Sequence, residues 1–482
     1  MWMWLTILWG CGPPTSIHLP APLLLHTSAL LPGRPLELRI EGLAPGSQVQ
    51  LASSWAPPGP GPCPDTLRGA CWELLPSLVD VAVADPGGVA RLLHAPAEPW
   101  GEALRLQAAE LGPSAFPARV RLSGIVERSP LRSLPLLDGD LIVASPDDLD
   151  RLDGIYGIGG DLIVTQTALT ELVLPELIEI GGDVQIWENP VLHTLRLPGL
   201  ERIGGDLNLY DDPVLVRPGL GSLEQIGGAL RIHRMPGLAD LGGLGALRHI
   251  GELYLYRDDG LISLSGLEAL ASVDGGIELM ELSALQQAVL PSLEHVGGRL
   301  YVLIAPSMVR LEAPALTSLR GLEIHAADAL PSPGLFPGIT RLGGELRLEY
   351  NGAMASLAGL SALEQVHSAT LRFNPSLATL ADASAWHTVD EELILGSNQA
   401  LERLDLPALQ QAGRLEITRN GALIDPGLSA LSALEQAEFS DNPALSSCAL
   451  EAWLDRVQPD QVACIGNLDD GCTGWCDPTG GP

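Results

Sequence analysis

The feature that most constrains this chain is a segment of 21 to 25 residues that repeats along most of its length. "ELIEIGGDVQIWENPVL" at 176–192 is followed by "GLERIGGDLNLYDDPVL" at 199–215 and "SLEQIGGALRIHRMPGL" at 222–238. Aligned on the run after the glycine pair, the expected strands start near 140, 161, 183, 206, 229, 252, 277, 299, 322, 345, 369, 392, 414 and 437. Self-similarity at this period predicts a solenoid, in which each coil buries its apolar face against its neighbours.

Each repeat contains the same parts. The glycine pair predicts a sharp turn with positive φ, because glycine has no Cβ to clash there. The run after it alternates apolar and polar residues, which predicts a strand with inward-facing pairs such as Val184 and Ile186. An Asn-Pro, Asp-Pro or Asn-Gly turn follows, and its side chain can cap backbone groups. Because no stretch between strands has the periodicity of a crossover helix, we expect a mainly β fold whose residues 131–446 form a right-handed parallel β-solenoid of about 14 coils.

The repeat also resembles a known family. "LPxLxxIGGDLxIxxNPxLxxL", written across residues 138–446, is similar to the receptor L domain. That domain is the leucine-rich, β-helical ligand-binding unit of insulin-receptor and epidermal-growth-factor-receptor ectodomains, and it also occurs in fungal and bacterial surface proteins. The resemblance implies a β-helical fold and a general role in binding something outside the cell. It does not imply growth-factor signalling, because the cysteine-rich module, membrane span and kinase of those receptors are not seen here.

The residues before the repeats divide into three stretches. Residues 1–11 are an apolar run that ends in "LWGC" and resembles the signal and lipobox of a bacterial lipoprotein, in which Cys11 would become lipidated. Residues 12–35 are rich in proline and indicate a tether. Residues 36–130 contain about seven short alternating runs and the hairpin sequence "DPGG", which predict an immunoglobulin-like β-sandwich. Another export route and a cytosolic chain with an apolar N-terminus are the alternatives.

Seven cysteines lie at the two ends of the chain, and assigning Cys11 to lipidation leaves six for three disulfides. Cys63 and Cys71 flank part of a proline-rich loop and would staple it locally. The other four are Cys448, Cys464, Cys472 and Cys476. We favour bridges from Cys448 to Cys464 and from Cys472 to Cys476 among the three possible pairings, with zinc ligation as the alternative. Disulfides indicate an oxidising compartment.

Residues 447–482 should cover the open end of the solenoid, because an uncapped end would expose apolar side chains and unpaired strand edges. A short helix over 448–457 would place Leu450, Trp453 and Leu454 on the last coil. The sequence therefore predicts a disulfide-rich cap.

The charge balance limits the partners. The formal net charge is −32, and all 27 basic residues are arginine. This acidity repels phosphate backbones, so we expect no nucleic-acid partner. The absence of lysine, together with many Ala, Gly, Pro and Leu residues, indicates a GC-rich genome. No later segment reaches the roughly 18 apolar residues of a membrane span, so we expect membrane contact only through an N-terminal lipid.

No motif of an enzyme or cofactor site is found. "GIYGIGG" at 154–160 has the glycines of a dinucleotide-binding loop, but no helix is expected after it, and we expect no cofactor. Glu188 and Asp211 should stack in neighbouring coils, next to Asp212, and form a candidate Ca²⁺ site; a solvated turn ladder is favoured over it. Glu416 and Glu438 should stack at a spacing that suits a retaining glycosidase, although the pattern shows no cleft around them.

The outward side chains of the strands are more informative. Four of the six tyrosines in the protein fall in a short window of outward positions. With neighbouring aromatic and basic residues they form the candidate ligand-binding set Trp187, Tyr210, Arg231, His233, Tyr254, Tyr256 and Tyr301. Aromatic rings among arginine and amide groups can stack on sugars or anchor a protein partner. The alternative is that aromatic residues simply suit strands.

We therefore expect a non-enzymatic protein of the bacterial cell surface, an outer-membrane lipoprotein, whose solenoid binds an extracellular protein or glycan. Two alternatives are a polysaccharide-active enzyme on a parallel β-helix and a purely structural envelope protein. The enzyme would need clustered carboxylates with a basic partner in a groove.

Overall fold

The chain forms two compact units, Met1–Leu134 and Pro135–Pro482. The structure, a computed structural model, describes residues 136–152, 154–472 and 474–476, together with the backbone of eight strands nearer the N-terminus. Cys11, Cys63 and Cys71 lie outside the described residues, so their roles stay predictions.

The N-terminal unit contains two antiparallel sheets. Its strands are β1 (Leu24–Thr27), β2 (Leu36–Glu41), β3 (Gln48–Ser54), β4 (Leu78–Val83), β5 (Ala90–His94), β6 (Leu104–Leu111), β7 (Val120–Leu122) and β8 (Val126–Arg128). One sheet has the order β1-β2-β5, and the other has the order β4-β3-β6-β7 with β8 also paired to β6. Two antiparallel sheets are the components of a β-sandwich; the immunoglobulin-like type stays a prediction. Strand β1 lies inside the stretch expected to be a tether, where it pairs with β2.

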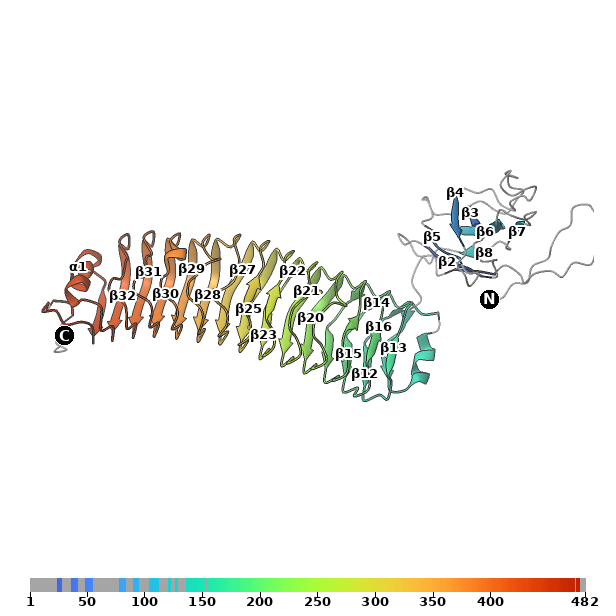
Figure 1. Ribbon diagram of the computed structural model, residues 1–482, viewed down its shortest axis with the longest axis horizontal. Coiled ribbons are helices and arrows are strands. Elements are labelled where there is room, and N and C mark those ends of the chain that lie inside the picture. The colour runs from blue at the N-terminus through green and yellow to red at the C-terminus, as the bar shows by residue number, and fades with distance from the viewer. Residues whose placement is uncertain are drawn as a thin grey trace, which may run out of the picture. The chain divides into compact units, whose positions relative to one another are not determined.

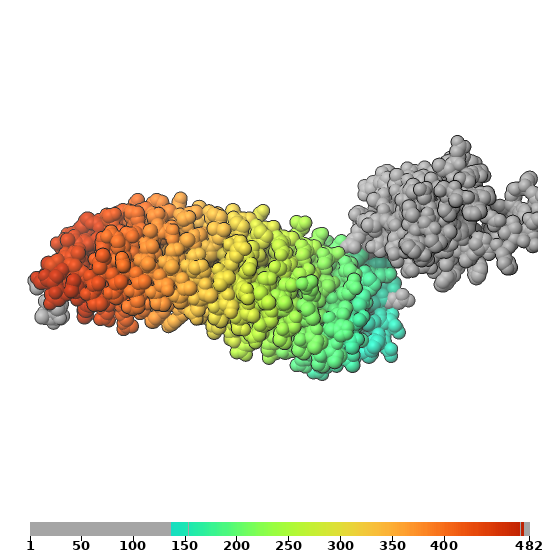
Figure 2. Space-filling view, in the orientation of Figure 1, coloured from blue at the N-terminus to red at the C-terminus, as the bar shows by residue number. Residues whose placement is uncertain are grey.

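The C-terminal unit is a parallel β-solenoid whose repeats, called rungs below, stack into a curved rod (Figures 1 and 2). Its long sheet contains β9 (Leu136–Leu137), β10 (Leu141–Val143), β11 (Gly157–Ile158), β12 (Leu162–Thr165), β14 (Glu179–Ile180), β15 (Val184–Trp187), β17 (Arg202–Ile203), β18 (Leu207–Tyr210), β20 (Gln225–His233), β21 (His249–Tyr256), β22 (Ser272–Val273), β23 (Ile277–Met280), β25 (His295–Leu303), β27 (Ser318–His325), β28 (Arg341–Glu349), β29 (Gln365–Arg372), β30 (Thr388–Gly396), β31 (Gln411–Thr418), β32 (Ala433–Ser440) and β33 (Gln461–Ile465). The predicted mainly β solenoid of about 14 coils is confirmed, since a strand lies at every predicted start from 140 to 437.

The side of each rung that lies across the core from the long sheet, called the second side below, is less regular. Short parallel strands form there in two groups, β13 (Glu171–Val173), β16 (Thr194–Arg196) and β19 (Pro218–Gly219), then β24 (Gln287–Val289) and β26 (Arg310–Glu312). Two 3₁₀ turns, η2 (Pro146–Leu152) and η3 (Ala381–Ala383), and the helix α1 (Ser447–Val457) complete the described elements. Mostly strand and turn is therefore the correct description of the rungs.

The core runs the length of the rod between the two sides. Val184 and Ile186 of β15 are fully buried, and their register partners in β18 are Leu207 and Leu209, which are also fully buried. Equivalent leucine, isoleucine and valine residues continue this double column in the other rungs. The strict alternation of the sequence therefore places one face of every strand inside and leaves the other face as the outer surface of the long sheet.

The glycine pairs have a different role from the one expected. No described glycine of these pairs has positive φ. Instead, a Cβ on Gly181 would lie 2.5 Å from the backbone oxygen of Gly159, and a Cβ on Gly204 would lie 2.2 Å from that of Gly181. At these two positions consecutive rungs approach so closely that no side chain fits between their backbones, whereas a Cβ on Gly343 of a later pair would have no atom within 4 Å.

Positive φ occurs instead at the residue that follows each strand. Thirteen non-glycine residues share a φ of 52° to 59° there: Gln166, Glu188, Asp211, Arg234, Arg257, Glu281, Ile304, Ala326, Tyr350, Phe373, Ser397, Arg419 and Asp441. This left-handed conformation costs a residue with a side chain about 1 kcal/mol or more. The same turn in every rung therefore requires a repeated compensating interaction.

In the rungs that carry asparagine, a ladder of its side chains supplies that interaction, whereas other rungs have an apolar residue there: Met235, Leu282, Ala305 and Ala327. Seven of the eight asparagines occupy the position after the left-handed residue: Asn189, Asn351, Asn374, Asn398, Asn420, Asn442 and Asn467. Asn398 is typical, because its Oδ1 accepts from the backbone N–H of Asn374 at 3.1 Å and its Nδ2 donates to the Leu371 carbonyl at 2.9 Å. The expectation that turn side chains cap backbone groups is confirmed, and the caps link one rung to the next.

The C-terminal cap is built around one more rung. Strand β33 pairs with β32 and extends the long sheet into the region expected to be only a cap. Helix α1 covers the second side, with Leu450, Trp453 and Leu454 buried as predicted. The Trp453 ring meets the ring of Phe439 edge-on at 5.5 Å.

The disulfides confirm that all four C-terminal cysteines are paired, but the favoured pairing was wrong. The bridges are Cys448–Cys472 and Cys464–Cys476. The reason lies at the start of α1, where the Asp470 carboxylate accepts from the Cys448 N–H at 3.0 Å and from Ser447 Oγ at 2.7 Å. This contact brings Cys472 to the helix, so Cys464 on β33 is left to meet Cys476.

Candidate functional site

The outward face of the long sheet carries a continuous column of aromatic rings. Trp187, Tyr210, His233 and Tyr256 are direct register partners on the neighbouring strands β15, β18, β20 and β21. The Tyr210 ring lies 5.5 Å from that of Trp187 and stacks on the His233 imidazole at 4.7 Å with an interplanar angle of 6°. Each ring is half-buried, so one part packs on the sheet and the rest faces solvent.

A second column of outward residues widens this surface. Tyr254 lies beside Tyr256, with ring centroids 6.2 Å apart, and its register partner is Arg231. Tyr301 lies two rungs further along, under the guanidinium carbon of Arg299 at 4.4 Å. The structure thus brings the seven predicted ligand-binding residues onto one sheet face. We call the surface formed by Trp187, Tyr210, Arg231, His233, Tyr254, Tyr256 and Tyr301 the aromatic strip.

Partial burial sets the protonation of the strip. Burial is the main cause that raises the pKa of Tyr210 and of Tyr254 above that of a free tyrosine, so both phenols stay protonated at neutral pH. Burial also lowers the pKa of His233, which favours the neutral form of its imidazole. The stacked Tyr210 and His233 rings therefore offer an uncharged aromatic surface with hydrogen-bonding edges.

Acidic side chains run along the glycine-pair edge of the strip. Carboxylates of Asp140, Asp161 and Asp183 each accept from the backbone N–H of the equivalent residue in the next rung, at 2.7 to 2.9 Å. Asp206 ends this series and pairs with the Arg231 guanidinium. The strip is thus bordered by negative charge, which disfavours anionic ligands.

The candidate Ca²⁺ ligands are not gathered into one site. Asp212 is fully buried in the asparagine ladder, where its Oδ1 accepts from the Asn189 N–H. Asp211 lies on the outside and pairs with Arg234, and Glu188 accepts from the side-chain amide of Gln166 at 2.8 Å. In the described part of the chain, the one close group of three potential metal ligands is Cys448, Asp470 and Cys472, two of which form a disulfide.

Glu416 and Glu438 stack in register as expected, and they line a hollow that the sequence did not reveal. The hollow has a volume of about 210 Å³. Glu416 Oε1 accepts from Arg372 at 2.5 Å and its Oε2 from Arg414 at 2.8 Å, while Arg414 also reaches Glu438 at 3.2 Å. Both oxygens of Glu416 therefore accept from guanidinium groups.

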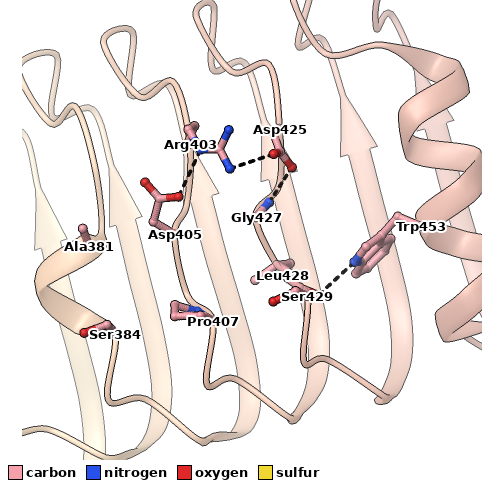
Figure 3. Close-up of a pocket in the computed structure, with 10 residues that line it drawn as sticks. All are labelled: Ala381, Ser384, Arg403, Asp405, Pro407, Asp425, Gly427, Leu428, Ser429 and Trp453. Carbon is pink, nitrogen blue, oxygen red and sulfur yellow. Dashed lines mark hydrogen bonds and ion pairs between the residues drawn. The ribbon is translucent and has the colours of Figure 1, made fainter.

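A larger hollow of about 470 Å³ lies on the second side, beside α1 (Figure 3). Arg403 spans its floor, with Nε 3.0 Å from Asp405 and a terminal nitrogen 2.9 Å from Asp425. Trp453 closes one end and donates to the Leu428 carbonyl at 3.3 Å. This hollow could not be predicted from the sequence, because α1 and residues of three different rungs form it together.

Other sequence observations find no support as sites. The glycines at 154–160 belong to a turn and the short strand β11. The described helices are too short or too polar to cross a membrane. Comparisons with models of protein families, with curated proteins and with solved structures find no significant match to this chain.

Proposed function

We propose that this protein is a non-enzymatic binding protein of the cell surface, and that its solenoid binds an extracellular protein or glycan through the aromatic strip. The observation that carries the proposal is the column Trp187–Tyr210–His233–Tyr256, in which four consecutive strands present rings at one outward position. Half-exposed rings interleaved with amide and guanidinium groups supply both stacking surface and hydrogen bonds.

Anchoring and export belong to the same proposal. A lipid on Cys11 would hold the protein at the outer membrane, and the N-terminal sheets come between this cysteine and the solenoid in chain order. The two disulfides of the cap support export to an oxidising compartment. The repeat pattern supports a relationship in fold to receptor L domains. Labelling cells with a radioactive fatty acid tests the anchor: label should enter the wild-type protein and not Cys11→Ser.

A binding experiment tests the aromatic strip. The full chain is applied to a glycan array and to extracellular proteins of neighbouring cells, and each ligand found is titrated against variants. Tyr254→Ala with Tyr256→Ala should weaken binding by about 30-fold, as expected for aromatic hot spots. Ile262→Ala with Val309→Ala, which trims exposed side chains on the second side, is the matched control.

The same experiment distinguishes the alternatives. If the tyrosine variant keeps its affinity for the ligand and its unfolding temperature is unchanged, the aromatic strip is not the binding surface. Release of shorter products from a bound polysaccharide would favour the enzyme, for which the cluster of Glu416, Glu438 and two arginines is the specific observation. Absence of any ligand would favour a structural envelope role.

A further inference from the structure

A second feature of the sheet face lies beyond the aromatic strip and does not depend on it. Tyr350 and Phe373 follow consecutive strands β28 and β29, and their rings stack at 4.6 Å with an interplanar angle of 8°. Both rings remain 53% and 40% exposed. Both residues also have positive φ, at 59° and 56°, which is a rare conformation for bulky side chains. Because the same φ recurs at this position along the solenoid, the exposed and stacked rings, rather than the backbone conformation, distinguish this site.

The stack of the Tyr350 and Phe373 rings ends at the edge of a hollow. In the next rung, the residue with positive φ that follows the strand is Ser397, and Gly396 precedes it at the end of β30. Phe373, Gly396 and Ser397 all line the hollow of about 210 Å³ described above. Tyr350 covers one face of the Phe373 ring, so the other face is turned toward the small residues of the following rung. A third planar ring can therefore continue the stack at about the same spacing.

The floor of the hollow is polar and is crossed by an ion pair. Arg372 reaches over Gly396 to Glu416, two rungs away, and this path exists because Gly396 has no side chain: a Cβ there would lie 3.2 Å from Arg372 Cγ. The register partners that follow Gly396 are Thr418 and Ser440, which are also small. In the described residues the hydroxyl groups of Ser397, Thr418 and Ser440 have no hydrogen-bond partner, and Glu438 uses only one of its oxygens.

We propose that this hollow binds one pyranose ring of a glycan, stacked on the free face of Phe373. A pyranose has an apolar face for the ring and a rim of hydroxyl groups for the three protein hydroxyls and Glu438. The volume is below the roughly 300–1,000 Å³ of sites for larger ligands, which fits a single ring. An aromatic side chain of a partner would leave the polar floor unpaired, and a nucleotide would bring phosphate to a strongly acidic protein.

The charged groups around the hollow also fit a neutral sugar. Arg372 and Arg414 are paired with Glu416 and Glu438, and Arg419 lies 3.7 Å from Asp441 at the rim. Arg414 also lies 3.7 Å from Glu392, so three arginines face four acidic residues and the cluster has no excess positive charge to attract an anion. Hydrogen bonds to ionised groups are stronger than those between neutral partners, which suits recognition of hydroxyl groups.

Saturation-transfer nuclear magnetic resonance of the full chain tests this site, with the methyl pyranosides of glucose, galactose, mannose and N-acetylglucosamine as probes. At least one probe should receive saturation from the wild type. Phe373→Gly removes the ring and also relieves the strain of positive φ, so this variant should be at least as stable as the wild type while its affinity falls about tenfold. Ala326→Gly, at the same position of another rung, should bind normally.

The outcomes separate this site from the aromatic strip. Binding that survives Tyr254→Ala with Tyr256→Ala and is lost in Phe373→Gly supports the hollow, whatever the strip binds. Equal saturation of a probe by wild type and Phe373→Gly would overturn the proposal, and so would the absence of saturation of all four probes.

Discussion

At the residue scale, two aspartates occupy the position, just after the left-handed residue, at which seven other rungs have asparagine. Asp212 and Asp258 are fully buried, and each uses its Oδ1 to accept a backbone N–H from the preceding rung. Their Oδ2 atoms have no hydrogen-bond partner in the described residues. An asparagine at this position donates from Nδ2 to a strand carbonyl, as Asn189 does to Val164 at 3.1 Å. An aspartate can make the same donation only when it is protonated.

Burial accordingly raises the pKa of Asp212 to about 6 and that of Asp258 to about 7. In the unfolded chain both groups titrate near a pKa of about 3.9. Folding therefore favours the protonated forms. Their contribution to stability is complete below about pH 4 and is lost as the pH rises through 6 and 7.

Replacing both residues, Asp212→Asn with Asp258→Asn, should remove this pH dependence. At pH 8 we expect the variant to be more stable than the wild type by about 3 kcal/mol per site, with a much smaller difference at pH 5. Denaturant unfolding at the two pH values measures this. Asp211→Asn, at the half-buried neighbour of Asp212 that pairs with Arg234, is the control and should show no such trend. A stability difference that is the same at both pH values would contradict the assignment.

The glycine pairs allow a second test at this scale. A Cβ on Gly204 would lie 2.2 Å from the Gly181 oxygen, whereas a Cβ on Gly343 would have no atom within 4 Å. Gly204→Ala should therefore destabilise the protein by about 2 kcal/mol or more, and Gly343→Ala should be neutral or slightly stabilising. Thermal unfolding of the two variants compares them directly. Equal effects would mean that close approach of the rungs is not the reason for the pairs.

At the element scale, the ladder joins each turn to the turn of the next rung. Asn398→Ala should leave the N–H of Asn374 and the carbonyl of Leu371 buried without partners, and should cost about 2 to 4 kcal/mol. Asn208→Ala is the matched control, since Asn208 is the one asparagine outside the ladder and its Oδ1 has only a 3.5 Å contact with Arg231. Urea unfolding measures both. If Asn208→Ala lowers the free energy of unfolding as much as Asn398→Ala does, the hydrogen bonds of the ladder have no special role in stability.

At the scale of the whole molecule, each rung contacts its neighbours, so stability is transmitted along one dimension. The cap protects one end of that series. Loss of the Cys464–Cys476 bridge in Cys464→Ala with Cys476→Ala should therefore increase hydrogen exchange in β31, β32 and β33 by about tenfold or more and leave β15 and β18 unchanged. Mass-spectrometric hydrogen exchange resolves these segments. A uniform increase along the solenoid would show instead that it unfolds as one cooperative unit.

The period of the repeat and the alternation within each strand were enough to locate the rungs, their inward leucines and the aromatic strip. These follow from the sequence alone because a strand has a period of two and identical rungs stack in register, so a local pattern determines which face each side chain occupies. The helix of the cap was also predictable, because Leu450, Trp453 and Leu454 share one helical face.

Only the tertiary structure decided the disulfide pairing, the reason for the glycine pairs and the two hollows. Each depends on distances between segments that the local pattern does not encode. Asp470 must reach the start of α1 before Cys472 can meet Cys448, and Gly396 matters because Arg372 and Glu416 approach it from rungs on either side. Sequence periodicity determines which way a side chain points, and the three-dimensional stacking of rungs determines what it meets there.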